Sequence, residues 1–484
     1  MLLDACRIVY CSVMTWINPS DVQSLHQCAR RVWYEHNPPP GMEAVAMNPF
    51  DALVASMGND YEQTVRERLA ATATMMTAQS AEHTKTLMAE GAPVIYQAHL
   101  KDEQEQFVGY PDFLIRQSGG RYQAADAKLA RKVDKEIAIQ LGFYRRLLGN
   151  DLPALAYLGT GEVVEIGDES NPDVNTYVTE IRSVLAETDP PLVRYSESKC
   201  RICPFYSVCK PAFVGKEELT LIYGIDKRSV MGLENHGITT ISALANADPA
   251  SIPDIPYLKG HEKKQRAVLQ AKAWKTGEMF KLKDITLPDG TWVHFDIETN
   301  PLTPHCEDHV YLWGFLKPSY QAGDFDYAWT DHHDDDRAGW NAFLAKVEEY
   351  CAAWPDLRLV HYSSYERTKI KEYAARYGME EHPTVTWLLD EENGPLFDLQ
   401  KPVKDCLVLP VAGYGLKAIC KHEHLVDFQW EDDESGSQWS FVQYVSFLNE
   451  PDPAKKEAMK QAILTYNRDD VIATRKLEEW LKSL

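Results

Sequence analysis

The chain has 484 residues, of which 44% are hydrophobic and 25% are charged, and its formal net charge is −22. This length exceeds what one compact domain usually holds, so two or three domains are expected. The composition is typical of a globular protein. The sequence contains no run of about twenty apolar residues, so no membrane span is expected.

The N-terminal residues and the cysteines indicate the compartment. The first residues lack a basic region and contain Asp4 and Arg7, so a signal peptide is not expected. The first residues are expected to form a strand, or to be a start-site extension ahead of Met14. Of the ten cysteines, three lie in one short stretch and the others are scattered, which differs from a secreted disulfide scaffold. This pattern favours the reducing cytoplasm and a metal or cluster site.

The negative charge bears on binding to nucleic acid. Phosphate affinity comes mostly from Lys and Arg, so a charge of −22 is unusual for a protein of that class. However, metal sites need carboxylates, and basic residues can gather locally. Residues 216–283 contain eleven Lys and Arg against eight Asp and Glu. The alternative is that the acidic excess only aids solubility.

The predicted elements begin with a helix that Ser20 caps and that continues to Glu35. Further helices are predicted at about 56–75 and 136–148. Two strands, 107–117 and 121–129, flank a turn at Ser118-Gly119-Gly120. Residues 220–275 are predicted to form short helices with Gly turns. A β-rich part then begins with a strand at 292–297.

The two central strands carry a first group of charged side chains. One ends in Gly-Tyr-Pro-Asp at Asp112, and the other carries Ala-Asp-Ala-Lys with Asp126 and Lys128. Because side chains alternate along a strand, Asp126 and Lys128 share a face, where Asp112 of the neighbouring strand can meet them. Two carboxylates can hold Mg²⁺ or Mn²⁺, and a lysine beside them can activate water. Glu62 could add a third carboxylate. The alternative is a solvated strand end.

A nearby helix extends this pattern with Gln140 and Tyr144, which lie one helical turn apart. The whole arrangement resembles the PD-(D/E)XK nucleases of the RecB family. The resemblance implies the following roles: metal ligation by Asp112 and Asp126, catalysis by Lys128, and assistance by Gln140 and Tyr144. That family often has a His or Glu in its first helix motif, and Gly58-x-x-x-Glu62 is the nearest match here.

Cys200, Cys203 and Cys209 form a C-x₂-C-x₅-C cluster. Close spacing lets three thiolates converge on one centre and leaves one position to fill. The pattern resembles the iron–sulfur nucleases of the RecB-like type, in which one Cys precedes the nuclease core and three follow it. The resemblance implies Cys28 as the fourth ligand of a structural 4Fe–4S cluster. A Zn²⁺ site with the same ligands is the alternative.

The connector around Gly237 contains a Gly-Ile turn between two short predicted helices. It resembles a helix–hairpin–helix motif, in which backbone N–H groups contact phosphates without reading sequence. The resemblance implies that Gly237, Thr239 and Thr240 bind nucleic acid. The alternative is a plain helical linker.

Asp296 and Glu298 lie at the end of an apolar strand and share one face. Buried carboxylates are strongly disfavoured unless they hold a metal. This Asp-x-Glu-Thr stretch resembles the first motif of DEDD exonucleases, which have an RNase H-like fold. The strand expected to pair with it runs over 310–315.

Two later motifs follow in the order of that family. Tyr365-Glu366 resembles the second motif, with Glu where Asp is usual, which the YprB-type branch tolerates. Tyr466 and Asp470 resemble the third motif at i, i+4 on the final helix, whereas Asp469 would point elsewhere. The resemblance implies that Asp296, Glu298, Glu366 and Asp470 hold two metal ions and that Tyr466 orients the attacking water. Phe397-Asp398-Leu399 and Gly415-Leu416-Lys417 resemble the branch's middle segment.

These features predict an α/β chain in three parts: a PD-(D/E)XK restriction-endonuclease-like domain over 1–215, a helix–hairpin–helix connector over 216–285, and an RNase H-like domain over 286–484. The whole resembles the bacterial RecB-like nucleases fused to a YprB-type domain. The expected function is metal-dependent, exonucleolytic cleavage of DNA, with RNA as the alternative substrate, at single strands or ends. A helicase is a candidate partner. The alternatives are a nucleic-acid-binding or assembly protein with one inactive domain, and a redox sensor.

Overall fold

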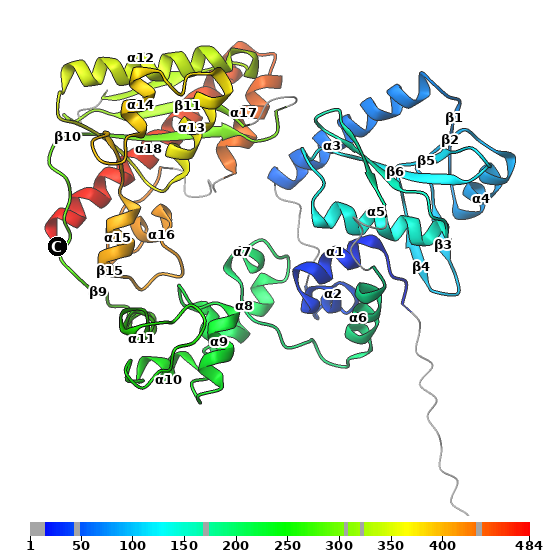
Figure 1. Cartoon of the computed structure of the whole chain (residues 1–484), viewed down its shortest axis with the longest axis horizontal. Helices are drawn as coiled ribbons and strands as arrows, with labels where there is room; N and C mark the ends of the chain where they lie inside the picture. The colour runs from blue at the N-terminus through cyan, green and yellow to red at the C-terminus, as the bar shows by residue number, and fades with distance from the viewer. Residues whose placement is uncertain (1–14, 43–48, 168–173, 304–307, 320–323, 432–437) are drawn as a thin grey trace, which may run out of the picture. The chain divides into compact units, whose positions relative to one another are not determined.

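The computed structural model describes residues 15–42, 49–167, 174–303, 308–319, 324–431 and 438–484. The chain divides into two compact units, residues 1–193 with 202–208 and residues 194–201 with 209–484 (Figure 1). The stretch ahead of Met14, for which a strand or extension was the expectation, lies outside the described residues. None of the helices in these ranges combines the length and apolarity that a membrane crossing requires.

The first unit is built on a six-stranded mixed sheet with the order β1–β2–β5–β6–β7–β8. Its strands are β1 (Met75–Thr77), β2 (Val94–Tyr96), β5 (Phe113–Arg116), β6 (Tyr122–Lys128), β7 (Ala154–Leu158) and β8 (Val163–Ile166). β1 and β2 are parallel, as are β6 and β7, and the other neighbours are antiparallel. A separate hairpin consists of β3 (Leu100–Asp102) and β4 (Phe107–Gly109).

Helices cover both faces of this sheet (Figure 1). Val65 of α3 packs with Phe113 and Ala125 on one face, whereas α5 packs with Leu114 and Ala124 on the other. Because side chains alternate along β6, Asp126 points to the α5 face. The helices of this unit are α1 (Pro19–Gln27), α2 (Ala29–His36), α3 (Pro49–Ala70), α4 (Ala81–Glu90), α5 (Lys135–Leu148) and α6 (Val174–Ala186).

The first helix differs from the sequence prediction at its start and in its length. Asn18, rather than Ser20, is the N-cap, and its side chain accepts hydrogen bonds from the backbone of Ser20 at 2.7 Å and Asp21 at 3.2 Å. Asp21 accepts one in return from the Asn18 backbone, which completes a capping box. Cys28 has an extended backbone and divides the predicted helix into α1 and α2.

The strand predicted over 107–117 is likewise two strands, β4 and β5. Residues 110–112 interrupt it, because Pro111 has no N–H to donate to a sheet ladder. The interruption creates a bend that carries Asp112.

The second unit contains a five-stranded sheet with the order β12–β11–β10–β13–β14. Its strands are β10 (Thr291–Asn300), β11 (His309–Leu316), β12 (Phe325–Trp329), β13 (Leu357–His361) and β14 (Leu396–Asp398). β10 is antiparallel to β11 and parallel to β13. A small additional sheet pairs β9 (Phe280–Lys281) with β15 (Leu407–Val408).

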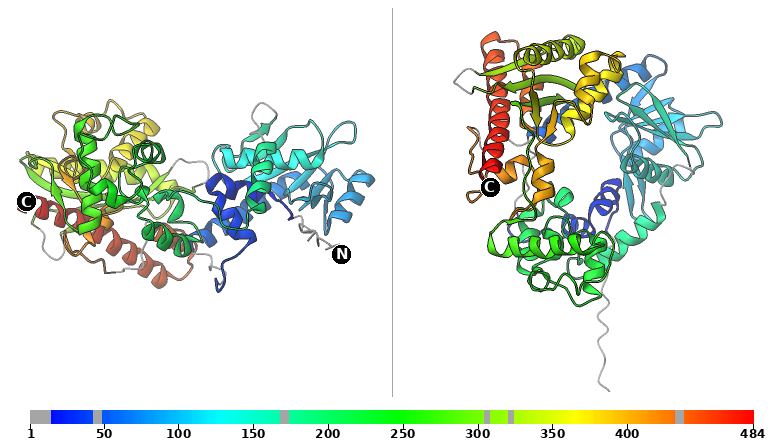
Figure 2. Two further views of the ribbon diagram at one scale, coloured as in Figure 1. Left: turned by 90° about the horizontal axis from the view of Figure 1, so that it is seen from below. Right: turned by 60° about the vertical axis from the view of Figure 1, so that its left-hand side comes forward.

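The two faces of this sheet receive different helices (Figure 2). Phe295 packs with Phe343 of α12 on one face, while Trp292 packs with Leu477 of α18 on the other. Alternation along β10 therefore turns Asp296 toward α18. The helices of this part are η2 (His333–Asp335), α12 (Asp336–Ala353), α13 (Tyr365–Tyr377), α14 (Pro383–Leu389), α15 (Gln400–Cys406), α16 (Leu416–Cys420), α17 (Trp439–Asn449) and α18 (Pro453–Ser483).

The predicted short helices precede this sheet and pack within the second unit. They are η1 (Leu219–Leu221), α9 (Lys227–Glu234), α10 (Ile241–Ala245) and α11 (His261–Thr276). Two side chains of α11 anchor them to the segment around β15. Arg266 donates a hydrogen bond to the carbonyl of Leu407 at 2.9 Å, and Gln270 donates to Leu409 at 2.6 Å. Two further helices, α7 (Glu197–Cys200) and α8 (Tyr206–Gly215), lie earlier in the chain.

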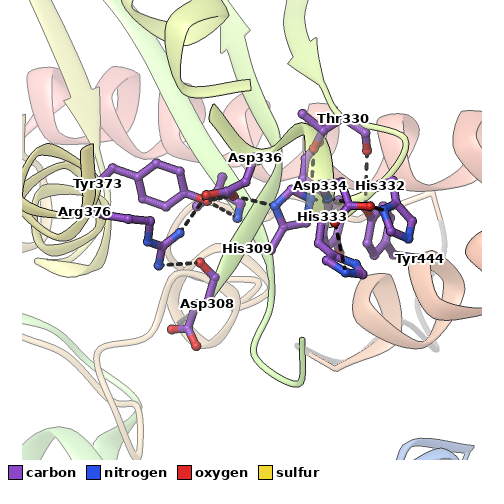
Figure 3. Close-up of polar contacts among 12 residues, drawn as sticks. Asp308, His309, Thr330, His332, His333, Asp334, Asp336, Tyr373, Arg376 and Tyr444 are labelled. Carbon is purple, nitrogen blue, oxygen red and sulfur yellow. Dashed lines mark hydrogen bonds and ion pairs between the residues drawn. The ribbon is translucent and has the colours of Figure 1, made fainter. Parts of the chain in front are cut away.

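A buried polar network connects β11 with α12, α13 and α17 (Figure 3). His309 is fully buried, with Nδ1 2.6 Å from Asp336 Oδ1 and Nε2 3.2 Å from the Tyr444 hydroxyl. Asp336 also accepts hydrogen bonds from Arg376, at 2.8 Å, and from Tyr373. Burial raises the pKa of Asp336, but these hydrogen bonds outweigh it and lower that pKa to about 2. The charged carboxylate therefore joins α12 and α13 to β11, and His309 extends the network to α17.

We expect Asp336→Ala to lower the free energy of unfolding by about 3 kcal/mol, because it leaves buried donors and the charge of Arg376 without their partner. Urea denaturation at pH 7 measures this loss. Asp335→Ala is the control, since Asp335 is exposed and makes no side-chain cap, and should change stability by less than about 0.5 kcal/mol. An equal effect of the two substitutions would contradict the role of the network.

The same network predicts a pH dependence. The pKa of Asp336 is lowered in the folded protein, so its contribution is fully present above the unfolded pKa of about 4 and is lost as the pH falls toward about 2. The stability difference between the unsubstituted protein and Asp336→Ala should therefore narrow below about pH 4. A difference that widens on acidification would refute this assignment.

Candidate active sites

In the first unit, β6 brings acidic side chains to the bend between β4 and β5. Asp126 is 1% exposed, and its Oδ1 accepts a hydrogen bond from the Asp112 backbone at 3.0 Å. Asp112 Oδ2 accepts one from the Ala127 backbone at 2.8 Å. Lys128 Nζ lies 3.0 Å from Asp126 Oδ2. The structure thus places Asp112, Asp126 and Lys128 together on the face that α5 covers.

The charges in this group act strongly on one another. Burial and the charge of Asp126 raise the pKa of Asp112 to about 8. Burial acts to lower the pKa of Lys128, but Asp126 and Asp112 together raise it. A cation among the carboxylates would relieve their repulsion. Carboxylate oxygens are the ligands that Mg²⁺ and Mn²⁺ prefer, so the residues present fit such an ion.

Glu62, the expected third carboxylate, lies on α3 beside this group. It is half-buried, and its charge contributes to the raised pKa values of both Asp112 and Lys128. Its own hydrogen bond is with the Tyr96 side chain, and the guanidinium of Arg66 lies 4.6 Å from the centre of the Tyr96 ring. Glu62 therefore adds negative charge beside the carboxylates of Asp112 and Asp126.

Gln140 and Tyr144 contact the backbone of the bend. The Tyr144 hydroxyl accepts a hydrogen bond from Gln140 at 2.9 Å and donates one to the Tyr110 carbonyl at 3.2 Å. The Tyr144 ring packs on Gly109, where a Cβ atom would lie 3.0 Å from the ring and 2.7 Å from Leu147. The glycine of the Gly-Tyr-Pro-Asp stretch thus makes room for the ring. This places Tyr144 as a residue that positions the bend.

In the second unit, β10 and α18 bring three carboxylates together. Ligand oxygens of Asp296, Glu298 and Asp470 all lie within 4.8 Å of one another. Burial and the neighbouring acids raise the pKa of Asp296 well above its usual range and that of Glu298 to about 8. Burial also raises the pKa of Asp470, to about 6, although Lys417 opposes the shift. The oxygen donor set fits Mg²⁺ or Mn²⁺.

Each of these carboxylates accepts a hydrogen bond from a neighbouring side chain. Asn467 Nδ2 donates to Asp296 at 2.8 Å, Ser440 Oγ donates to Glu298, and Trp430 Nε1 donates to Asp470 at 2.8 Å. Such donors fix carboxylate orientation.

Glu366, the remaining expected ligand, is buried on α13 but is not part of the group of three. Its charge contributes to the raised pKa of Asp296. Its Oε2 is buried, accepts no hydrogen bond within the described part of the chain, and lies 3.3 Å from His361 Nδ1.

An unusual backbone turn precedes Glu366. Ser363 has φ of 102°, a left-handed conformation that costs about 1–3 kcal/mol outside glycine. His361 donates a hydrogen bond to the Ser363 carbonyl at 2.6 Å, and the Ser363 N–H donates to Asp398 at 3.0 Å. These bonds hold the turn that starts α13.

Tyr466 and Asp469 lie on different sides of α18. The Tyr466 hydroxyl accepts a hydrogen bond from Lys417 at 2.9 Å, and burial together with the charge of Asp470 raises its pKa. Asp469 instead accepts a hydrogen bond from the Glu431 backbone at 2.9 Å. Tyr466 therefore belongs to the same side as Asp470.

The four expected cluster ligands are all half-buried. Cys28 separates α1 from α2, and Cys203 accepts a backbone hydrogen bond from Tyr206; both lie in the first unit. Cys200 ends α7 and Cys209 lies in α8, and both are grouped with the second unit.

The residues expected to bind nucleic acid surround the turn between α9 and α10. Gly237 has φ of 78°, which glycine adopts without strain. Thr240 is the N-cap of α10, and its hydroxyl accepts a hydrogen bond from Ala243 at 3.1 Å. Thr239 is exposed.

Several residues of the second site have no role in the sequence prediction. Asn467 lies three residues before Asp470, so helical spacing could have placed it on the same face. Lys417 stands in a segment that the family resemblance identified, but without a function. Ser440 of α17 and Trp430, which lies between α16 and α17, also contact the acids, and the sequence around them carries no local signal for these contacts.

One further group of metal-ligand type occurs among the described residues, at His332, His333 and Asp334 (Figure 3). His332 Nδ1 already accepts a hydrogen bond from the Asp334 backbone at 3.2 Å. That imidazole nitrogen therefore caps the local turn.

Comparisons with known proteins assign a superfamily to each of two parts of the chain. Residues 21–210 match the PD-(D/E)XK nuclease superfamily, and residues 293–482 match the RNase_H superfamily. Among curated proteins, none matches the chain. The crystal structure of SSO0001 matches with 16% identity and a TM-score of 0.25, covering 41% of this chain and 86% of that one. The mixed α/β chain thus joins a domain of the PD-(D/E)XK nuclease superfamily to a domain of the RNase H superfamily, as the motifs predicted.

Proposed function

We propose that the protein is a metal-dependent nuclease that hydrolyses phosphodiester bonds of DNA, with RNA as the second substrate to test. The observation that carries the proposal is the convergence of Asp296, Glu298 and Asp470 within 4.8 Å. Buried carboxylates at this spacing are unfavourable without a cation, so their convergence supports a metal site.

In the second site, divalent metal ions would supply activation of water and stabilisation of the leaving oxygen. Asp296, Glu298 and Asp470 would hold them, and Glu366 would contribute from α13. Tyr466 orients the attacking water through its hydroxyl. Lys417 supports this role because its hydrogen bond to that hydroxyl leaves the O–H group directed away from the ammonium.

In the first site, Asp112 and Asp126 would bind the ion, with Glu62 adding negative charge. Lys128 is 3.0 Å from Asp126 and can orient water against a phosphate. Tyr144 and Gln140 keep the Asp112 bend in place through the Tyr110 carbonyl.

Exposed aromatic rings beside both sites support single strands or ends as the substrate. Tyr110 is 56% exposed and precedes Asp112 by two residues, and Tyr365 is 42% exposed and directly precedes Glu366. Unpaired bases stack on such rings without sequence preference.

The helix–hairpin–helix connector would add affinity for the backbone of the substrate. The turn at Gly237 and the exposed Thr239 present polar groups next to the Thr240 cap of α10. Residues 216–283 also have three more basic than acidic side chains. Both features favour contacts with phosphates.

For the cysteines we propose a 4Fe–4S cluster held by Cys28, Cys200, Cys203 and Cys209, with Zn²⁺ as the alternative. Within the first unit, the ring of Tyr34 packs on Phe205, with ring centres 5.2 Å apart. This contact joins the helix after Cys28 to the segment after Cys203. A labile cluster fits the reducing cytoplasm.

Asp126→Ala and Asp296→Ala test the two sites with end-labelled single-stranded DNA and RNA in Mn²⁺. Each substitution should reduce the cleavage that its own site supports by more than about 100-fold. Loss of a residue that only orients a metal ligand already costs about 10–100-fold. Cleavage should disappear in the double variant. Asp469→Asn is the matched control on α18 and should keep full activity. Unchanged cleavage by the double variant would exclude both sites.

The same assay decides the alternative of one inactive domain. The position of Glu366 outside the group of three favours an inactive second site. Under that alternative, Asp126→Ala alone abolishes cleavage and Asp296→Ala leaves it unchanged.

Metal binding to the first site should depend on pH. Asp112 has a pKa of about 8 without metal, so it must lose a proton when a cation binds at pH 7. Mn²⁺ affinity should therefore rise from pH 6 to pH 8 and level off above. Calorimetric titration of the Asp470→Ala variant with Mn²⁺, in buffers of different ionisation enthalpy, measures the affinity and the proton release at the first site. Equal affinity at pH 6 and pH 8, with no proton released at pH 7, would contradict it.

For the cysteines, anaerobically purified protein should be brown and contain iron, whereas Cys203→Ser should be colourless and less stable. Cys351→Ser is the control, because Cys351 is also half-buried but lies on α12, outside the Cys motif. Zinc without colour would establish the alternative metal, and neither metal would exclude the site. Activity that follows the oxidation state of the cluster would support a redox sensor.

A further inference from the structure

Asn467 is the residue of α18 that contacts both acids of β10. Its side chain is fully buried, and Nδ2 donates to Asp296 Oδ2 at 2.8 Å and to Glu298 Oε1 at 3.3 Å. Ser440 and Trp430 each donate to one acid of the group. The amide of Asn467 therefore fixes the distance between the two carboxylates of the strand.

The surroundings determine which way this amide points. Asn467 Oδ1 is buried and has no hydrogen-bond donor in the described part of the chain. The NH₂ group faces two carboxylate oxygens, and the opposite orientation would place the amide oxygen against both of them. Electrostatics thus favours the orientation in which the NH₂ group faces the acids.

Gly314 provides the space for this side chain. It pairs with Asp296 in the register of β10 and β11, so it lies directly beside the site. A Cβ atom at position 314 would lie 1.7 Å from Asn467 Oδ1, a separation that no side chain can keep. Any residue other than glycine would therefore displace the amide from the acids.

We propose that Asn467 is a positioning residue that holds Asp296 and Glu298 in the orientation for metal binding. The absence of a side chain at Gly314 provides the space for the Asn467 amide. The inference rests on the proposed metal site of the second unit. Donors that orient ligating carboxylates typically account for about 10–100-fold in metal affinity. The amide also offsets charge between the two acids before a cation arrives.

The test measures Mn²⁺ binding to the full-length protein by electron paramagnetic resonance, with Asp126→Ala as the parent in which the first site is disabled. Asn467→Leu keeps the branched shape of the side chain and removes the donor. Gly314→Ala keeps every polar group and displaces the amide. Each should weaken Mn²⁺ binding about 10–100-fold. Asp469 lies on another side of the same helix, so Asp469→Asn should bind Mn²⁺ as tightly as the parent.

The combination of the two substitutions separates positioning from general damage. If both act through one contact, the double variant binds Mn²⁺ no more weakly than Asn467→Leu alone. Losses that multiply in the double variant, or Asn467→Leu binding within two-fold of the parent, would overturn the inference. Circular dichroism verifies that each variant is folded, and a misfolded Gly314→Ala leaves the Asn467→Leu comparison decisive.

Failure of the proposed function gives a different result. If the parent binds Mn²⁺ no better than the parent carrying Asp296→Ala, the second site binds no metal, and both proposals fall. If Asp296→Ala abolishes binding while Asn467→Leu leaves it intact, only the positioning role of Asn467 is refuted.

Discussion

Repulsion between buried carboxylates is the constraint on which both units depend. Desolvation and neighbouring charge disfavour ionised acids that share a pocket, and the raised pKa values of Asp112, Asp296 and Glu298 express this cost. The surrounding sheet and helices must hold these side chains against their repulsion. In the first unit Lys128 supplies the opposing charge, whereas in the second Lys417 and three uncharged donors surround the acids.

Both groups use the same geometric solution. A strand turns alternate residues to one face, and a helix that covers this face completes the group, as α5 does for Asp126 and α18 does for Asp296. The opposite faces are packed with large apolar side chains, among them Phe113 and Phe295. This packing fixes the strand positions and thereby the spacing of the acids.

Local sequence patterns were sufficient for the parts of the sites that lie on one element. Alternation placed Asp126 beside Lys128, and helical spacing distinguished Asp470 from Asp469. Element ends were less predictable, because Asn18 competes with Ser20 as a cap and an extended Cys28 divides a continuous helical pattern. Ser440 could not be predicted, since it reaches Glu298 across 142 residues and no pattern near either position signals that contact.

The two acidic groups also differ in how far apart their members lie along the chain. Asp112 and Asp126 are 14 residues apart, whereas Asn467 and Asp296 are separated by 171. Closing the longer loop costs about 2 kcal/mol more chain entropy, which the packing of α18 on the sheet must offset. Local opening of α18 would carry Asn467 and Asp470 away from β10 and dismantle the second group, whereas Asp112 and Asp126 lie outside that helix.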